Sequence, residues 1–401
     1  MRPNRTRVNA RKSKFFTPKT FLSAMIKLVT GTNKEGYDIA LDQLTEEMKA
    51  TEHTPSRSAF SQFRRSISFH FFEHIFQTLI LGWLPERQKW KGLYVTSIDG
   101  DSFVLPASKE LLNEGYSGRP CKHNRETYYP VGYFTSATDV ISGCPIDFDF
   151  VSNNNEISAA IRILDKSQFA NRTLTIFDRF YLSSDLLSHY QFEGAGFFLA
   201  RCKKRGTFKE ITDFADSRLE DELVSIDGDL LRLIRYRHAG SDEDIILATN
   251  LPSSFSADEI GGAYSRRWES ETANRDRTST LKIEQFHAKT LNGIMQEIYA
   301  TLIVQAIARL VATLEEKSQD KMREKAYALP NLKAMIHSIG RNAYKLLVLK
   351  CKDSFDRLLR IAHVSLETRE RYSRSYPRRL RRIIGNLYDH QSLINRRKKS
   401  A

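Results

Sequence analysis

The sequence predicts a mixed α/β fold in which a sheet with flanking helices follows a helical N-terminal region. Three observations support this prediction. Residues 15 to about 84 have the apolar spacing of helices, residues 93–200 alternate short apolar strands with helices, and residues 202–257 contain charged, alternating segments typical of strands. Helical patterns return at about residue 258 and dominate to the end of the chain.

Proline and hydroxyl residues mark two helix starts in the N-terminal region. Thr17-Pro18 and Thr54-Pro55 each place a capping hydroxyl before a proline at the first helical position, where the missing N–H costs nothing. These pairs predict helices that begin at about residues 18 and 55.

A short basic helix is expected next, over residues 58–67 (SAFSQFRRSI). It carries Gln62, Arg64 and Arg65 on a partly apolar segment. Such a helix could lie in a DNA groove, as in helix-turn-helix proteins, or it could be the solvated face of a small bundle. The pattern favours neither alternative.

Five short strands are predicted after Trp90. Their ranges are 93–98, ending at Asp99-Gly100, then 128–137, 144–150, 174–177 and 197–200. Asp139 to Gly143 predicts a hairpin between the second and third, Asn155 caps a helix to about residue 164, and Ser183 or Ser184 begins another. Three consecutive strands, then helix, strand, helix and strand, is the order of a ribonuclease H-like core.

The expected organisation has five parts. They are a helical N-terminal domain (1–88), the first part of the ribonuclease H-like core (89–201), a β-rich insertion (202–257), the closing helices of the core with the third acid (258–320) and a basic helical C-terminal region (321–401).

Charge indicates the class of partner. The 401 residues include 62 Lys and Arg against 48 Asp and Glu, a net charge of +14, which favours a polyanion because each cation on a phosphate releases counterions. The four cysteines form no CxxC pair, which argues against a structural zinc site. Polar or charged residues interrupt the apolar stretches 69–84 and 300–314, so no membrane association and a cytoplasmic protein are expected.

Two aspartates follow apolar strands. Asp99 and Asp178 are expected at strand ends, where α/β sheets bring side chains together in a crevice. An isolated Asp after a strand is usually a turn former. Converging carboxylates, however, repel unless cations neutralise them, and two divalent ions about 3.5–4 Å apart can drive phosphoryl transfer.

A third acid lies in the segment 264–282 (YSRRWESETANRDRTSTLK). On one continuous helix, Tyr264, Arg267 and Glu271 fall within about 60° of one another, and Arg275 and Lys282 share their face. A carboxylate flanked by cations suits a metal ligand beside phosphate clamps. A surface helix with i, i+4 ion pairs explains the same residues, and composition alone favours it.

Four motifs resemble one known family. IDGDSFVLP around Asp99, FDRFY around Asp178, GFFLAR from Gly196 and YSRRWESE around Glu271 look like the transposases of the insertion-sequence-four family, within the DDE superfamily. The resemblance runs from about residue 11 to residue 382. The family signature has Tyr, Arg, Glu and Lys at fixed spacing. The first three positions match, and Thr278 stands where the family has Lys.

The resemblance implies a ribonuclease H-like catalytic domain over residues 89–201 and 258–320, a helical N-terminal DNA-binding domain over residues 1–88, and cut-and-paste transposition. Asp99, Asp178 and Glu271 would then be catalytic ligands of two Mg²⁺ or Mn²⁺ ions, and Tyr264 and Arg267 would contact the phosphates of the cleaved strand. It also implies that double-stranded DNA at terminal inverted repeats and target DNA are the partners. A homodimer in the synaptic complex and association with the bacterial nucleoid are expected.

Three residues on the same helix add to the expected DNA contacts. Trp268 could stack on an unpaired base, although a buried tryptophan that anchors the helix is the simpler interpretation. Arg275 or Lys282 could take the role of the missing lysine. Asp101 stands where Thr or Ser is commoner in the family. It could be a spare metal ligand, but a solvated turn residue is the favoured interpretation.

Two further hypotheses remain open. A ribonuclease H-like nuclease or resolvase would share the metal chemistry without strand joining. A catalytically decayed transposase would bind specific DNA sequences without cutting, and Thr278 in place of lysine is the observation that favours it.

Overall fold

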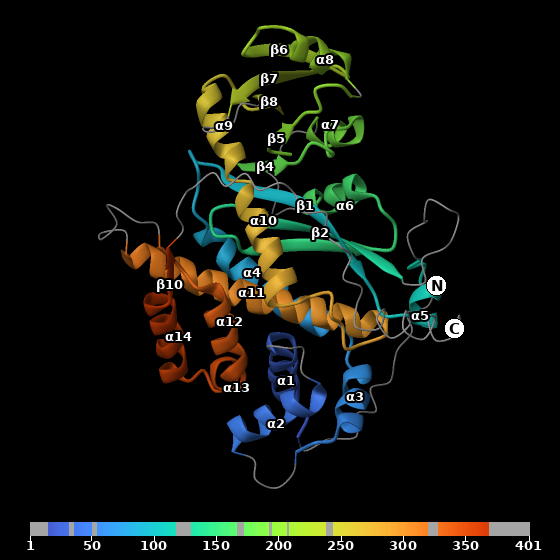
Figure 1. Ribbon diagram of the computed structural model, residues 1–401, viewed down its shortest axis with the longest axis vertical. Coiled ribbons are helices and arrows are strands. Elements are labelled where there is room, and N and C mark those ends of the chain that lie inside the picture. Colours follow the sequence, from blue (N-terminus) through green and yellow to red (C-terminus); the bar gives the residue numbers. More distant parts are fainter. Residues whose placement is uncertain are drawn as a thin grey trace, which may run out of the picture. The chain divides into compact units, whose positions relative to one another are not determined.

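The computed structural model (Figure 1) describes most of the chain up to Thr368. The described residues are 15–31, 36–49, 54–117, 130–166, 172–191, 195–206, 208–237, 244–319 and 328–368. The basic segments 369–382 and 396–399, with the cysteine and histidine at 121 and 123, lie outside the described residues.

The N-terminal region is helical, as predicted. Its helices are α1 (Pro18–Thr30), α2 (Tyr37–Met48), α3 (Arg57–Ser66) and α4 (His70–Trp83), followed by the 3-10 turn η1 (Leu84–Glu86). Thr17 caps α1 ahead of Pro18, as expected. The prediction for Thr54-Pro55 was wrong, because α3 begins two residues later and the Ser56 hydroxyl accepts from the amide of Ala59.

Eight strands form one mixed sheet in the order β3-β2-β1-β4-β5-β8-β7-β6. The strands are β1 (Tyr94–Val104), β2 (Val131–Asp139), β3 (Pro145–Val151), β4 (Thr173–Phe177), β5 (Phe197–Arg201), β6 (Asp221–Ile226), β7 (Asp229–Arg237) and β8 (Asp244–Thr249). The first three strands are antiparallel neighbours, and β4 and β5 continue parallel to β1. This confirms the predicted ribonuclease H-like order.

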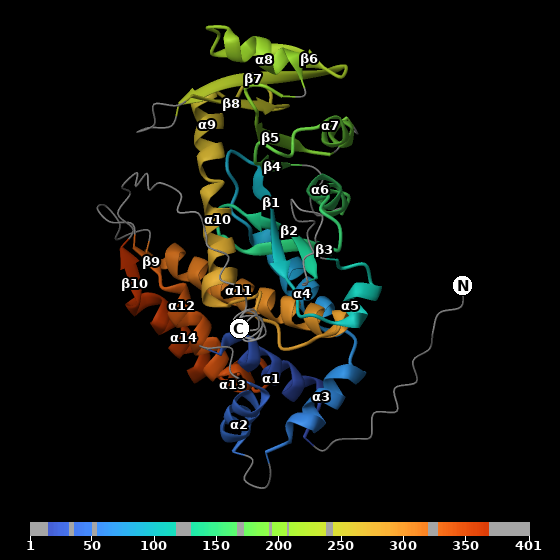
Figure 2. The ribbon, with the colours of Figure 1, turned by 45° about the vertical axis from the view of Figure 1, so that its right-hand side comes forward.

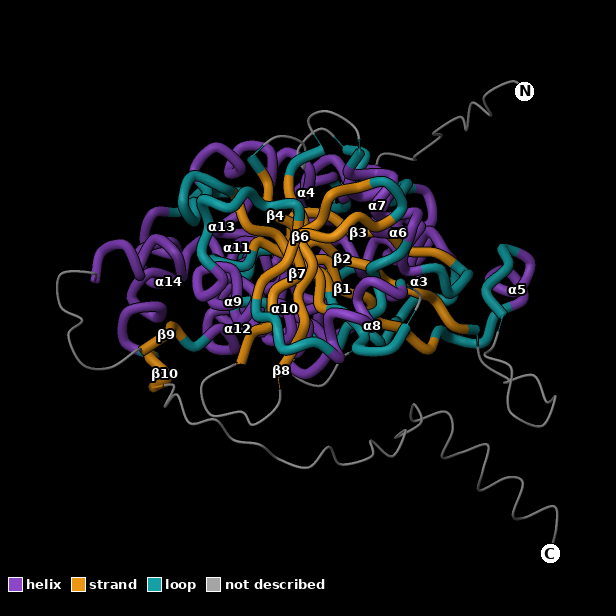
Figure 3. The backbone as a smooth tube through the Cα atoms, turned by 90° about the horizontal axis from the view of Figure 1, so that it is seen from above, coloured by secondary structure: helices purple, strands orange, loops and turns teal. Residues whose placement is uncertain are grey.

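Short helices occupy the connections between these strands. They are α5 (Lys109–Asn113), α6 (Glu156–Leu164), α7 (Ser184–Tyr190) and α8 (Lys209–Asp216). The predicted caps of α6 and α7 are confirmed, since Asn155 and Ser183 each accept from a backbone amide of the first turn. Viewed from above, helices surround the strands on both sides (Figure 3).

Strand β1 is longer than predicted. It continues past Asp99 to Val104, because β2 pairs with it from Thr96 to Val104 although β4 pairs only as far as Ile98. Asp99 therefore lies within a strand rather than in the turn after it. The backbone groups of residues 99–104 bond to β2, and the apolar run that ends at Ile98 gave no sign of this pairing.

The predicted β-rich insertion continues the same sheet. Strand β8 pairs antiparallel with β5, and β7 and β6 follow it outward. A buried Thr249 hydroxyl donates to the carbonyl of Phe198 across the β5–β8 junction. The three strands are thus joined to the core through backbone and side-chain hydrogen bonds.

The segment 264–282 is not one helix, which corrects the prediction. Helix α9 (Ala257–Ser265) ends before α10 (Trp268–Arg275), and α10 passes into the π-helical turn η3 (Asp276–Thr280). Lys282 follows with φ of 46°, outside the helix. The face predicted at 100° per residue therefore does not extend to Lys282.

Helices and a small two-stranded sheet complete the described chain. They are α11 (Leu291–Gln319), α12 (Leu332–Arg341), α13 (Ala343–Leu347) and α14 (Lys352–Val364), with β9 (Ala328–Pro330) antiparallel to β10 (Leu366–Thr368). Figure 2 shows α11 crossing beneath the end of the sheet, between it and the helices α1, α2 and α3.

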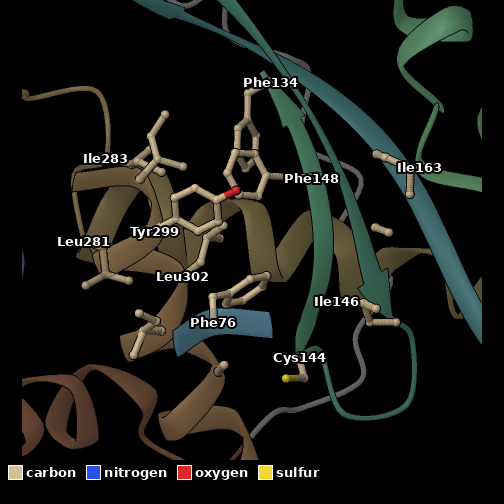
Figure 4. Close-up of a cluster of buried hydrophobic side chains, with 14 of the residues drawn as sticks. Phe76, Phe134, Cys144, Ile146, Phe148, Ile163, Leu281, Ile283, Tyr299 and Leu302 are labelled. Carbon is tan, nitrogen blue, oxygen red and sulfur yellow. The ribbon is translucent and has the colours of Figure 1, made fainter. Parts of the chain in front are cut away.

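Helix α11 is central to the core. Tyr299 packs edge-on against Phe148 of β3 with ring centroids 4.8 Å apart, and it lies close to Phe76 of α4 (Figure 4). By length and composition the stretch Leu291–Leu314 could cross a membrane, but 72% of its most apolar window is buried inside the protein. Most of its apolar side chains therefore pack in the hydrophobic core of the protein.

Candidate active site

Asp99 and Asp178 lie side by side at the end of a parallel strand pair. The last paired residues of β1 and β4 are Ile98 and Phe177, and each aspartate is the next residue in the chain: Asp99 within β1, and Asp178 just after β4. Adjacent strands are about 4.8 Å apart, so two carboxylates at matching positions share one region of the sheet. Both side chains are half-buried.

Helix α10 brings the third acid to this region. Glu271 forms an ion pair with Arg267, one turn earlier, with 2.6 Å between Nη2 and Oε1. The charges of Asp178 and Glu271 both act on Asp99, and both also act on Arg267. The three acids predicted from the sequence therefore lie in one electrostatic neighbourhood, with the Arg267 guanidinium among them.

The environment of Asp99 disfavours its charge. Burial raises the pKa of Asp99 to about 6, and the Asp178 and Glu271 carboxylates add to this rise against the opposing charge of Arg267 and the Gly100 amide. A carboxyl with this pKa is half-protonated near pH 6 in the absence of an added cation. Positive charge brought to this site would favour the ionised form.

The three acids have the donor chemistry for hard divalent cations, because carboxylate oxygens are the ligands such ions prefer. Within the described part of the chain, no three His, Cys, Asp or Glu residues are already grouped as a metal cluster. Glu271 points to Arg267 instead, but its side chain is 42% exposed and so has room to turn. The donor chemistry of the three acids fits a divalent cation, and tight convergence of their carboxylates remains a prediction.

A chain of hydrogen bonds links Asp99 to the buried Arg277. Asn274 donates to Asp99 Oδ2 over 3.0 Å, and Asn274 in turn accepts from Arg277. Arg277 also donates to Ser136 Oγ over 2.9 Å and contacts Gln305 of α11. This chain of hydrogen bonds fixes the side of Asp99 that faces α10.

Sequence reasoning missed both Asn274 and Arg277. Burial lowers the pKa of Arg277 to about 10, while the carboxylates of Asp101 and Asp99 oppose that shift, so the residue stays protonated at neutral pH. Arg277 stands immediately before Thr278, the position where the resembled family has lysine. The only signal in the sequence was that Arg277 is a cation next to the position of the family lysine. On a regular helix, Arg277 would lie on a different face from that position.

The other residues predicted on this helix are placed differently. Tyr264 is buried at 7% exposure against the sheet, with Arg267 over its ring. Arg275 is exposed, and Thr278 is half-buried, with its hydroxyl donating to the carbonyl of Asn274 over 3.0 Å. The backbone places Trp268 at the start of α10, and its side chain lies outside the described residues.

Asp101 also differs from its expectation. It is half-buried within β1, pairs with Phe134 of β2 in the backbone register, and lines the narrow pocket under Asp99 together with Arg277. The prediction of a solvated turn residue was wrong, because the strand continues through it.

The three residues of α3 that were predicted to contact DNA differ in their exposure to solvent. Gln62 and Arg65 are exposed. Arg64 is only 4% exposed and forms a buried ion pair with Glu297 of α11, 2.7 Å from Nη2 to Oε1. Arg64 therefore does not face a ligand, which corrects the prediction: its charge joins α3 to α11.

Comparison with known proteins points to one family. A family described as the transposase DDE domain matches residues 90–307, more than half of the chain, and that range includes all three acids. Among solved structures, the piggyBac transposase synaptic complex with hairpin DNA aligns with a TM-score of 0.46 and 10% identity, covering 89% of this chain and 77% of that one. A search of curated proteins gave no match.

Proposed function

Because this chain belongs to the DDE transposase family, we propose that it cuts DNA at the ends of an insertion sequence and joins those ends to target DNA. Asp99, Asp178 and Glu271 would hold two Mg²⁺ or Mn²⁺ ions. The observation that carries the proposal is the placement of Asp99 and Asp178 directly after the paired residues Ile98 and Phe177, with α10 contributing Glu271 beside them.

The bound ions would supply charge for an in-line displacement at phosphorus, activating the attacking oxygen and stabilising the leaving one. The protein's own contribution is to hold three carboxylates at one place. Asp99 is fixed by β1 and by Asn274, and Asp178 by the end of β4. Glu271 lies on α10 with a side chain that is 42% exposed, which leaves it room to turn.

Arg267 has two tasks in this proposal. In this structure its guanidinium neutralises Glu271 and the field of Asp178. With Glu271 holding an ion instead, Arg267 would be free to donate to a phosphate of the cleaved strand. Arginine suits this because its planar fork binds carboxylate and phosphate with the same geometry.

The proposed partners are double-stranded DNA at the terminal inverted repeats and target DNA, bound by a homodimer in the synaptic complex. The net charge of +14 supports a nucleic-acid partner. Exposed Gln62 and Arg65 on α3 and exposed Arg275 on α10 are the predicted side chains that are free to reach DNA. A location at the nucleoid in a bacterial cytoplasm is part of the same proposal.

The test is cleavage of a DNA fragment that carries the inverted repeats flanking the gene. Purified protein should nick or cut at the repeat only with Mg²⁺ or Mn²⁺, and the Asp178→Asn variant should lose this activity, since it keeps size but removes a charge that holds the ion. Equal cleavage by wild type and Asp178→Asn would reject the metal-ligand assignment.

The products separate the proposal from its alternatives. A transposase joins the cut end to a second DNA, which yields a strand-transfer product on a gel. A nuclease or resolvase gives cleavage alone, and a decayed transposase gives binding to the repeat without either product.

A further inference from the structure

A groove between α12 and α14 has the properties of an anion site. It has a volume of about 560 Å³ and lies within the described part of the chain. Three arginines line it: Arg341, Arg357 and Arg360. Its other lining residues are neutral or weakly basic: Ala334, His337, Ser338, Asn342, Ile361, Val364 and Ser365. None of these residues is acidic.

Helical spacing gathers the cations on two facing surfaces. Lys333, His337 and Arg341 stand at i, i+4 and i+8 of α12, so they fall within about 80° on that helix. Arg357 and Arg360 stand three residues apart on α14, which packs against α12. Both helices therefore direct positive charge toward the groove.

The arginines of the groove are not neutralised. The side chains of Arg341, Arg357 and Arg360 are exposed and form neither an ion pair nor a hydrogen bond with any described residue. The field of the groove also acts on His337, since burial and then the charges of Lys333 and Arg341 lower the pKa of that histidine. Several unpaired guanidinium groups around one hollow repel one another unless an anion lies between them.

We propose that this α12–α14 groove binds the phosphate backbone of duplex DNA, separately from the site around Asp99. The inference rests on the proposed function, because it assumes that DNA is the substrate. Guanidinium forks on two helices can each donate to phosphate oxygens, and they read charge rather than base sequence. The chain's own tail after Thr368 is rich in arginine and lysine, so like charge argues against that tail as the occupant.

The experiment measures binding without catalysis. Fluorescence anisotropy with a labelled duplex of unrelated sequence is recorded over a salt series, without divalent cations. The triple variant Arg341→Ala, Arg357→Ala, Arg360→Ala should bind about tenfold more weakly at low salt. Its slope of log affinity against log salt should be shallower by about 2 to 3, because each phosphate that an arginine no longer neutralises reduces the slope by about 0.9.

Two controls separate position from charge and folding. Lys49→Ala, Lys109→Ala, Arg218→Ala removes the same charge from exposed residues outside the groove. Arg341→Lys, Arg357→Lys, Arg360→Lys keeps the charge in the groove and should restore most of the salt slope. Thermal unfolding of each variant verifies the fold.

The outcomes are distinct. The proposed DNA site is rejected if the alanine triple variant of the groove binds the duplex as tightly as wild type does. It is also rejected if the control variant Lys49→Ala, Lys109→Ala, Arg218→Ala loses the same factor of affinity. If wild type itself shows no affinity for duplex DNA, the proposed function fails together with the groove. Weaker binding to RNA with unchanged binding to duplex DNA would assign the groove to a different polyanion and overturn the inference.

Discussion

Arg64 and Arg277 are both buried arginines, 4% and 2% exposed, but their partners differ in kind. Arg64 donates to the carboxylate of Glu297, to Gln296, to the Tyr37 hydroxyl and to the Gly293 carbonyl, so its charge is neutralised where it lies. This region, where α3 meets α11, is a closed and satisfied network.

Arg277 is bound by neutral groups only. Ser136, Asn274 and Gln305 accept its hydrogen bonds, while the carboxylates of Asp99 and Asp101 act on it through space. The charge of Arg277 is thus only partly neutralised. Asn274 binds both Arg277 and Asp99, so it connects this charge to the candidate active site. The difference teaches that burial of an arginine does not define its role. Arg64 is bound directly to a carboxylate that would be left buried without it, whereas Arg277 is held by amides and a hydroxyl, one of which also binds Asp99.

The largest effect is expected at Arg64. Arg64→Ala leaves the buried carboxylate of Glu297 without its cation, which costs about 3–5 kcal/mol of unfolding free energy. Chemical denaturation measures this decrease. Arg65→Ala, on the same helix but exposed, is the matched control and should change stability by no more than about 0.5 kcal/mol. Equal decreases would remove the basis for calling Arg64 structural.

The second effect has the opposite sign and concerns Asp99. Its folded pKa of about 6 lies above the ordinary value of 3.8, so this group favours folding below pH 4 and loses that contribution as pH rises to about 6. Asp99→Asn, which does not ionise, should therefore raise the free energy of unfolding above pH 6 by up to about 3 kcal/mol.

The measurement for Asp99 is thermal unfolding of both proteins from pH 4 to 8 without metal. The advantage of Asp99→Asn should grow across pH 4 to 6 and then level off. Added Mg²⁺ should narrow it, because a cation favours the ionised carboxyl of the wild type. A constant difference across the pH range would contradict the raised pKa.

Arg277 should give a smaller decrease in stability than Arg64 and a larger decrease in function. Arg277→Met removes hydrogen bonds to Ser136 and Asn274 but breaks no direct ion pair, so a decrease of about 1–3 kcal/mol is expected. Without Arg277, Asn274 no longer holds Asp99 in place, so DNA cleavage should fall even at a temperature where the variant is folded. Asn274→Ala should then reduce cleavage less in the Arg277→Met protein than in wild type. Comparing Asn274→Ala in both backgrounds tests that coupling. Additive effects of the two changes would contradict it.

The smallest effects are expected at the exposed face of α10. Arg275→Ala should weaken cleavage of the DNA end about tenfold, because it removes one exposed charge-assisted hydrogen bond worth about 1.5 kcal/mol, and it should leave stability unchanged. Thr278→Lys restores the lysine of the resembled family and should raise cleavage. Arg218→Ala, an exposed residue near β6, is the control. If Arg275→Ala cleaves like wild type, the clamp lies elsewhere.

The amino-acid sequence was sufficient for the order of elements and for the DDE transposase family, whereas the roles of the three acids stay predictions. Apolar runs and caps such as Asn155 and Ser183 predicted helices and strands that the structure confirms, because these signals are local. The motifs around Asp99, Asp178 and Glu271 indicated the family, since their order along the chain reflects one catalytic architecture.

Tertiary structure decided how side chains meet. The extension of β1 through Asp101, the break before α10 and the π-helical turn η3 all depend on partners distant in sequence. A single extra residue in a helical turn changes which side chain faces inward, and so it is Arg277 that supports Asp99. Local periodicity contains no record of such contacts. For the same reason Arg64 and Arg65, adjacent and identical in the sequence, were separated into core and surface only by the packing of α3 on α11.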